Sequence, residues 1–154
     1  RGWDPRLCDV YFGCNFPPGW VNTTFIADVE VAKYMSSLDG YDYEVQMGFD
    51  INIEMSHKAY NKLGAHLRPL VTNRFKVKDW HNTGHYAVNR AIELGATEIH
   101  VWGADSRFYD STESITTIRN NAVSDKILTT KWNQVWDEII QNNPSVKIIF
   151  HEPL

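Results

Sequence analysis

The stretch from His81 to Asp105 constrains the fold more than any other part of the sequence. Its Asn-Thr-Gly start predicts a turn, and Asn82 or Thr83 is suited to cap a following helix. Apolar residues then recur at helical spacing, at Ala87, Val88, Ala91, Ile92 and Leu94. This spacing predicts a helix, and Gly95 is suited to end it. Glu98 to Trp102 is predicted to form a short strand, and Gly103 to Asp105 ends it. The stretch is therefore interpreted as one helix–strand unit of a parallel sheet.

Strands and helices are predicted to alternate along the rest of the chain. Predicted strands span residues 9–14, 23–27, 43–47 and 146–150, and predicted helices span 30–38, 54–63 and 125–142. Residues 67–71 are expected to be extended, 73–80 to form a loop, and 106–124 to form a long surface loop. This alternation, with three nearly continuous apolar strands, predicts an α/β fold: a Rossmann-like three-layer sandwich with a mostly parallel sheet.

Length and composition restrict the classes of protein. The 154 residues suit a single domain, and 43% hydrophobic residues is ordinary for a globular protein. A net charge of −4 argues against a non-specific nucleic-acid binder, and no apolar run is long enough to span a membrane. With no signal peptide in view, we expect a cytoplasmic protein in which Cys8 and Cys14 are free thiols, a disulfide between them being the alternative.

Polar residues follow the predicted strands, at the edge where open α/β sheets bind ligands. Asn82, Thr83 and Gly84 could hold phosphate or ribose at a helix N-terminus, or could simply cap the helix. Asp105 and Asp28 each end a strand, so each could hold a metal ion or a ribose hydroxyl, or cap a turn.

Two further residue types near this edge suggest roles in a reaction. His85 is a candidate acid–base group, because imidazole titrates near neutral pH. Phe108 or Tyr109 could stack a base, and the aromatic content of 13% fits such a site, although large aromatic residues also fill cores.

The segment NTGHYAVNRAIELGATEIHVWGADSRFY resembles a segment of two related Rossmann-like groups. One group is the bacterial sialyltransferases that act on lipooligosaccharide. The other is the MptE-like domain, named for a pterin diphosphokinase. DVYFGCN, which ends at Asn15, resembles the early strand of both groups, whose Asn touches the nucleotide, and WDEIIQNNPSVKIIFHEP resembles their last helix and strand. The resemblance covers about half of the chain.

The resemblance implies a nucleotide-dependent transferase, in the first place a glycosyltransferase that uses a nucleotide sugar and a glycan or small-molecule acceptor. Five residues would hold the nucleotide: Asn15, Asn82, Thr83, Gly84 and Gly103. The ring of Tyr109 would stack on its base. Asp105 or His85 would assist the leaving phosphate or the acceptor hydroxyl. In the diphosphokinase group Mg²⁺ is bound by acidic residues, for which Asp28, Glu30 and Asp105 are candidates here.

Two departures keep a third hypothesis open. Both groups begin with a strand and a Gly-rich loop that binds phosphate. In this sequence only Arg1-Gly2 corresponds to any part of that region. The single domain over residues 1–154 is therefore expected to lack its first strand and phosphate loop. The sialyltransferases carry a catalytic His before the last helix, and no His lies between Arg107 and Trp132. A non-catalytic nucleotide-binding module therefore remains an alternative beside the glycosyltransferase and the diphosphokinase.

Overall fold

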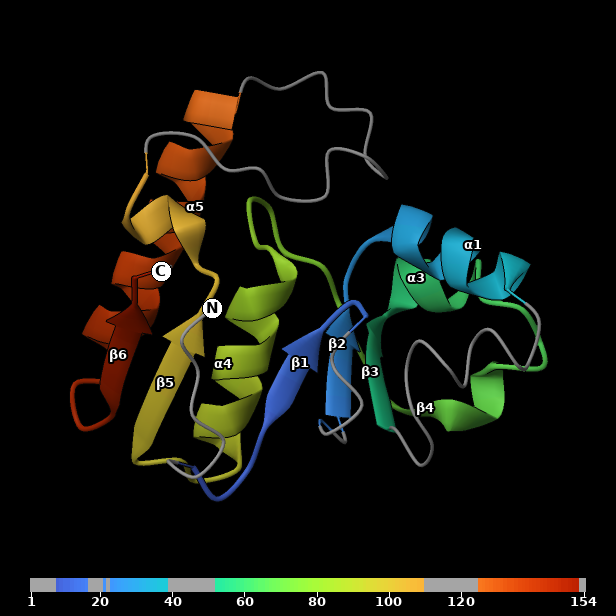
Figure 1. Ribbon diagram of the computed structural model, residues 1–154, viewed down its shortest axis with the longest axis horizontal. Coiled ribbons are helices and arrows are strands. Elements are labelled where there is room, and N and C mark those ends of the chain that lie inside the picture. Colours follow the sequence, from blue (N-terminus) through green and yellow to red (C-terminus); the bar gives the residue numbers. More distant parts are fainter. Residues whose placement is uncertain (1–7, 17–20, 22, 39–51, 110–124, 153–154) are drawn as a thin grey trace. The chain divides into compact units, whose positions relative to one another are not determined.

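The chain divides into two compact units, each with its own sheet (Figure 1). The computed structural model describes residues 8–16, 21, 23–38, 52–109 and 125–152. The N-terminal unit is Cys8–Asp79, and the C-terminal unit comprises Trp80–Leu154 together with Arg1–Leu7. Every strand pairing among the described residues is parallel, which confirms the predicted α/β class with its mostly parallel sheet.

The N-terminal unit contains a four-stranded sheet in the order β1-β2-β3-β4. Its strands are Phe12–Cys14, Thr23–Ile26, Asn52–Ser56 and Val71–Phe75. Helix α1 (Val29–Ser37) follows β2, and the short helix α3 (His57–Tyr60) and the 3-10 turn η2 (Arg68–Leu70) lie between β3 and β4. Because all four strands run the same way, the residues that follow them share one edge of this sheet.

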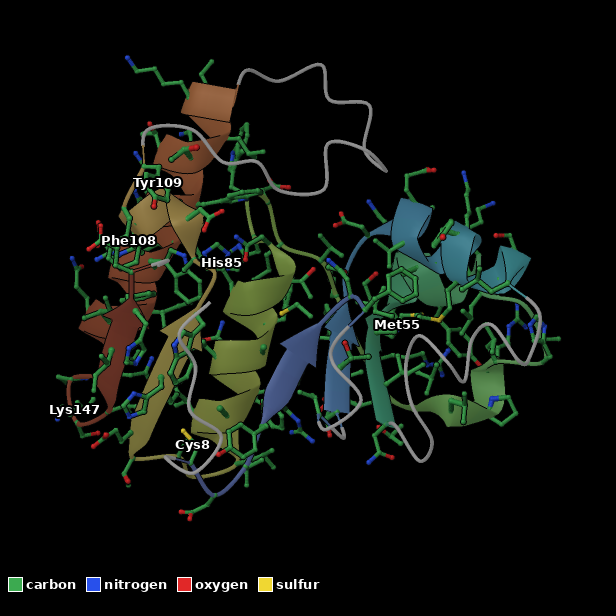
Figure 2. The ribbon with its side chains drawn as sticks, viewed as in Figure 1. Cys8, Met55, His85, Phe108, Tyr109 and Lys147 are labelled. Atoms are coloured by element: carbon green, nitrogen blue, oxygen red, sulfur yellow. The ribbon has the colours of Figure 1, made fainter. Side chains whose placement is uncertain are left out.

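The core of this unit forms where α1 and α3 pack against the middle strands. Fully buried apolar side chains from β2, β3 and both helices form one cluster: Ile26, Val31, Ala32, Met35, Ile53, Met55, Ala59, Leu63 and Leu67. Figure 2 labels Met55 within this unit. Burial of a side chain of this size contributes about 1.5–3 kcal/mol, so this cluster is a main source of the unit's stability.

The prediction of a helix over residues 54–63 is wrong for its first part, because Asn52–Ser56 forms β3 and only His57–Tyr60 is helical. The extended segment predicted over 67–71 is mostly a 3-10 turn, and the loop predicted over 73–80 begins only after β4 ends at Phe75, so residues 73–75 are strand and 76–80 are the expected loop. The cause is tertiary: β3 is buried between β2 and β4, and Glu54, a helix former, is held there by Asn73, whose Nδ2 donates to its Oε1 at 2.8 Å. The strand predicted over residues 43–47 lies outside the described residues.

The C-terminal unit contains helix α4 (Thr83–Glu93), strand β5 (Glu98–Trp102), the 3-10 turn η3 (Asp105–Arg107), helix α5 (Asp125–Asn142) and strand β6 (Lys147–His151). The helix and the strand predicted between His81 and Asp105 are confirmed, and so is the helix predicted over residues 125–142. Of the loop predicted over 106–124, the described part begins with η3, and residues 110–124 are not described.

Both helices of this unit cover the same face of the β5–β6 pair. Val88 of α4 and Val135, Trp136 and Ile139 of α5 form a buried cluster against apolar strand residues that share one face: Ile99, Val101, Ile148 and Phe150. The opposite face of the pair carries Glu98, His100, Trp102 and His151. The carboxyl ends of β5 and β6 therefore lie beside the N-terminal ends of the two helices (Figure 1).

Two smaller predictions also have outcomes. None of the helices among the described residues is long and apolar enough to cross a membrane. Cys8 and Cys14 both carry free thiols, as expected.

The buried hydroxyl of Ser56 joins three elements of the N-terminal unit. Its Oγ donates to the Ala27 carbonyl at 2.7 Å and accepts from the Ala59 amide at 3.1 Å, so it links the end of β2 to the cap of α3. Ser56→Ala should lower the free energy of unfolding by about 2 kcal/mol, because the buried Ala27 carbonyl loses its donor and α3 loses its cap. Chemical denaturation monitored by circular dichroism measures this change.

Ser37→Ala is the matched control. The Ser37 hydroxyl is exposed and donates only to the Tyr34 carbonyl of its own helix, at 2.6 Å. Its loss should cost no more than about 0.5 kcal/mol. Equal effects of the two substitutions would contradict the role assigned to Ser56.

Candidate functional site

The N-terminus of α4 is closed by a reciprocal cap between Asn82 and His85. The Asn82 Oδ1 accepts from the His85 amide at 3.1 Å, and the Asn82 amide donates to Nδ1 of His85 at 2.9 Å. Such a box satisfies two backbone donors that the helix itself leaves unpaired. The sequence left two interpretations of Asn82 open, binding of phosphate or ribose and capping of the helix. The geometry shows that Asn82 caps the helix.

His85 is fully buried and ties α4 to α5 (Figure 2). Its Nε2 lies 3.2 Å from the Trp132 carbonyl, and its ring lies edge-on to Trp136 with the centroids 4.2 Å apart. Since Nδ1 accepts in the cap, Nε2 carries the proton and donates to Trp132. Burial, with a smaller contribution from the charge of His81, lowers the pKa of His85 from 6.5 to about 3. Both ring nitrogens are thus engaged in structural hydrogen bonds.

The other two residues of the turn are also part of this joint between helices. Thr83 is buried. A Cβ atom at Gly84 would lie 3.5 Å from the Trp136 ring and 3.3 Å from the Asn82 Oδ1, so the missing side chain provides room for Trp136. Gly84 thus has a packing role in this joint, and its role in holding phosphate or ribose stays a prediction.

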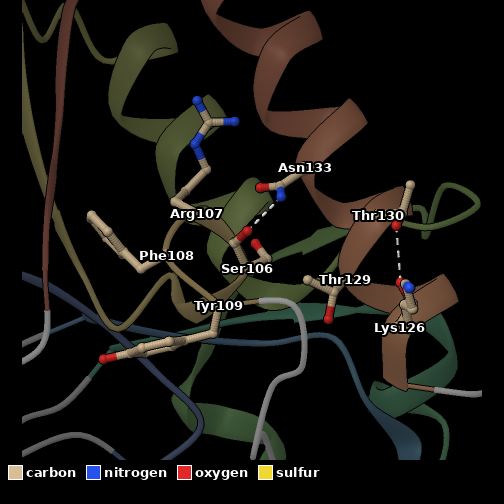
Figure 3. Close-up of a pocket in the computed structure, with 8 residues that line it drawn as sticks. All are labelled: Ser106, Arg107, Phe108, Tyr109, Lys126, Thr129, Thr130 and Asn133. Carbon is tan, nitrogen blue, oxygen red and sulfur yellow. Dashed lines mark hydrogen bonds between the residues drawn. The ribbon is translucent and has the colours of Figure 1, made fainter.

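An open cleft lies nearby, where η3 faces the first turns of α5 (Figure 3). We call it the η3–α5 cleft; its volume is about 230 Å³. It is lined by polar and aromatic side chains that follow β5 or lie on α5: Ser106, Arg107, Phe108, Tyr109, Lys126, Thr129, Thr130 and Asn133. The cleft thus lies at the carboxyl end of a parallel strand, where ligands bind in open α/β sheets.

The lining of the η3–α5 cleft combines buried hydroxyls with exposed groups. Ser106 and Thr129 are buried, whereas Lys126 and Thr130 are exposed and the Tyr109 side chain is 47% exposed. Lys126 forms no ion pair with any other described residue. A lysine ammonium beside several hydroxyls is an arrangement suited to binding an anion such as phosphate.

Three contacts fix the η3 side of the cleft to the rest of the unit. The Asn133 Nδ2 donates to the Ser106 carbonyl, and the Asn133 Oδ1 is a buried acceptor without a partner among the described residues. Arg107 pairs with Asp137 at 2.9 Å and stacks on the Phe150 ring at 4.9 Å. In Figure 3 its guanidinium points away from Thr129 and Tyr109. Arg107 therefore anchors η3 and does not supply charge to the cleft.

Among the predicted site residues, Tyr109 lines this cleft and Asp105 directly precedes it. The Asp105 carbonyl accepts from the amides of Phe108 and Tyr109 at 3.0 and 2.9 Å, which turns the chain back toward α5. Gly103 lies in the left-handed region with φ of 81°, and a Cβ there would meet no atom within 4 Å. The backbone at Gly103 is therefore open to a ligand in a conformation that favours glycine.

The remaining predicted residues, Asn15, Asp28 and Glu30, belong to the N-terminal unit, where Glu30 pairs with Lys33 on α1. Asn15 follows β1 with φ of 59°, and its Oδ1 is buried without a partner among the described residues. Asp28 follows β2 and precedes α1 without capping it through its side chain. Since β1 and β2 are parallel neighbours, both residues lie at the same edge of this sheet. That they join the residues of the C-terminal unit in one crevice stays a prediction.

A second polar cluster covers the face of β5–β6 that lies opposite α4 and α5. Glu98 Oε1 is 2.7 Å from His100 Nε2, His100 Nδ1 is 2.8 Å from His151 Nε2, and His151 stacks on Trp102 at 4.1 Å. The hydrogen bond from His100 and the charge of Lys147 lower the pKa of Glu98, and burial lowers the pKa of His151. In the part of the chain that the structure describes, no three acidic, His or Cys side chains are arranged to hold a metal ion.

Most of the cleft was missed by sequence reasoning because α5 was interpreted only through its apolar face. Lys126, Thr129, Thr130 and Asn133 recur at helical spacing on that helix, and such a polar stripe usually faces solvent. The available signal was that this stripe opens a helix that follows directly on the long segment after β5.

No family model, curated protein or solved structure matches the chain.

The state of His85 provides a test of the joint between α4 and α5. Its ring should stay neutral at every pH above about 4, given the lowered pKa of about 3. The C2 proton of His85, assigned by comparison with His85→Gln, should therefore show no titration between pH 5 and 8 in NMR spectra. A midpoint near 6.5 would contradict the buried joint.

The same shift predicts how stability depends on pH. The unfolded chain takes up a proton on His85 below its ordinary pKa of 6.5, whereas the folded protein does so only near 3. The contribution of His85 to stability is thus complete above pH 6.5 and is lost as pH falls toward 3, at up to about 1.4 kcal/mol per pH unit. His85→Gln should remove this part of the pH dependence in denaturation measurements.

Proposed function

We propose that the chain is a nucleotide-dependent transferase, in the first place a glycosyltransferase that uses a nucleotide sugar. The phosphate-bearing part of the nucleotide binds in the η3–α5 cleft. The observation that carries the proposal is the set of groups around this cleft: a Lys126 ammonium with no ion pair among the described residues, three hydroxyls, and the exposed ring of Tyr109 at the end of a parallel strand. The resemblance of the 82–109 segment to nucleotide-dependent transferases supports the same assignment.

The phosphate is bound by groups from both walls of the cleft. Lys126 supplies a charge-assisted hydrogen bond, which is roughly twice as strong as one between neutral groups. The hydroxyls of Ser106 and Thr130 add donors, although Thr130 also donates to the Lys126 carbonyl at 3.0 Å in the free protein. The helix that carries Lys126 and Thr130 has its positive end here, which further favours an anion.

The base of the nucleotide stacks on Tyr109 at the rim of the cleft. The volume of about 230 Å³ is smaller than that of pockets that enclose a whole ligand, about 300–1,000 Å³, so the cleft receives only part of a nucleotide. An exposed aromatic ring at the rim can stack a base at a gain of about 1–3 kcal/mol. Gly103 and Asp105 lie just before the cleft in sequence, and Asp105 is assigned to a ribose hydroxyl, to Mg²⁺ or to the acceptor hydroxyl.

His85 has no part in this proposal, because its two ring nitrogens serve the helix cap and the contact with Trp132. The same observation favours a second candidate function, a nucleotide-binding module without catalysis. The diphosphokinase alternative differs from both in requiring Mg²⁺ for its reaction. Release of free nucleotide from CMP-, UDP- or GDP-sugars separates the glycosyltransferase from the binding module, which would bind these compounds without cleaving them.

Binding itself is tested by thermal shift with CMP, UMP, CDP, GDP, AMP and ATP, with and without Mg²⁺. At least one nucleotide should raise the unfolding temperature, since a ligand that binds only the folded state stabilises it. Lys126→Gln should weaken the binding of that nucleotide about 10- to 100-fold, because a charge-assisted contact is lost. Tyr109→Ala should weaken it about 5- to 100-fold through lost stacking.

Lys131→Gln is the matched control on the same helix. The Lys131 ammonium lies 5.6 Å from the Trp80 ring centroid and does not line the cleft. Its substitution changes the net charge as Lys126→Gln does and should leave the affinity within about twofold. Equal losses in both variants, or no loss in either, would show that the cleft is not the site.

A further inference from the structure

The charges of the N-terminal unit are segregated along the chain. Between residues 55 and 78 there are six Lys or Arg residues and no Asp or Glu: Lys58, Lys62, Arg68, Arg74, Lys76 and Lys78. Between residues 8 and 54 the only Lys or Arg is Lys33, against eight acidic residues: Asp9, Asp28, Glu30, Asp39, Asp42, Glu44, Asp50 and Glu54. A net charge of −4 for the whole chain therefore conceals a strongly basic segment, which we call the 55–78 basic segment.

The cations of this segment are all exposed. All six lie at the surface, on or beside α3, η2 and β4. Lys58, Lys62, Arg68, Arg74 and Lys76 form no ion pair with any described residue. Cations grouped in one stretch of chain repel one another, which an anionic partner would offset.

Two of the arginines are held in place by one aromatic ring. The Arg74 guanidinium lies 4.5 Å and the Arg68 guanidinium 5.3 Å from the centroid of Tyr60, and the Arg68 Nε also donates to the Leu63 carbonyl at 3.2 Å. Tyr60 belongs to α3, Arg68 to η2 and Arg74 to β4, so the ring of one element brings together cations from two others. Stacked guanidiniums keep their N–H donors available for phosphate.

We propose that the 55–78 basic segment binds the surface of an anionic lipid bilayer. A polybasic surface of about four to eight Lys and Arg residues is the feature that recognises acidic headgroups. The segment therefore carries the unit to a membrane surface by charge, without inserting into the bilayer.

The described residues favour a lipid surface over a nucleic acid. Binding of a single strand depends on exposed aromatic rings, and none of the exposed large hydrophobic residues of the N-terminal unit, Val10 and Tyr34, lies in the segment. Reading of a duplex groove needs an element that enters it, whereas α3 has only four residues.

Vesicle sedimentation of the full chain tests the proposal. Vesicles with about a third phosphatidylserine should bind the protein at low salt and release it as ionic strength rises toward 1 M, whereas pure phosphatidylcholine vesicles should not bind it. Each cation removed should lower the partition coefficient about fivefold. Arg68→Gln with Arg74→Gln should thus lower it about 25-fold, and so should Lys58→Gln with Lys76→Gln, whose side chains make no contact that the fold needs.

The control with the same change of net charge is Lys33→Gln with Lys147→Gln. Both lysines lie outside the segment and pair with Glu30 and Glu98 respectively. This control should lower the partition coefficient no more than about twofold. Equal effects of Lys58→Gln with Lys76→Gln and of the control would overturn the proposal. So would equal binding to neutral vesicles, or tighter binding to a DNA duplex than to vesicles of the same phosphate concentration.

Discussion

The buried joint between His85 and α5 is the interaction on which the candidate site depends. One side chain completes the cap of α4, donates to a backbone carbonyl of α5 and packs against Trp136. An imidazole does this only when neutral, and burial keeps it neutral by lowering its pKa. Helix α5 forms one wall of the η3–α5 cleft, so His85 helps to hold that wall in position although it does not line the cleft itself.

The sequence predicted the elements whose pattern is local and strong. The helix over 125–142 and the strand over 98–102 have the predicted bounds, since their apolar residues recur at a clear period and turn residues flank them. Asn52–Ser56 was missed as a strand because its residues suit a helix, and only burial between β2 and β4 makes it extended. Such a choice depends on partners that lie far away in the sequence.

The candidate site was predicted only in part, for a related reason. Tyr109 and the position of Asp105 followed from the rule that residues after parallel strands face ligands. The roles of Asn82, Gly84 and His85 could not be decided from sequence, because a capping residue and a phosphate-binding residue have the same preferences at a helix N-terminus. The net charge of the whole chain also hides the 55–78 basic segment, since it sums that segment with the acidic residues before it.

Hydrogen exchange with the nucleotide that gives the largest thermal shift is the most direct test of the proposed site. Ligand binding in the η3–α5 cleft should slow the exchange of amides in Ser106–Tyr109 and in Lys126–Asn133, because the ligand contacts both walls. The amides of Asn82–His85 should change less, since they are already closed by the helix cap. Protection centred on Asn82–His85, with no change at the walls of the cleft, would contradict the account.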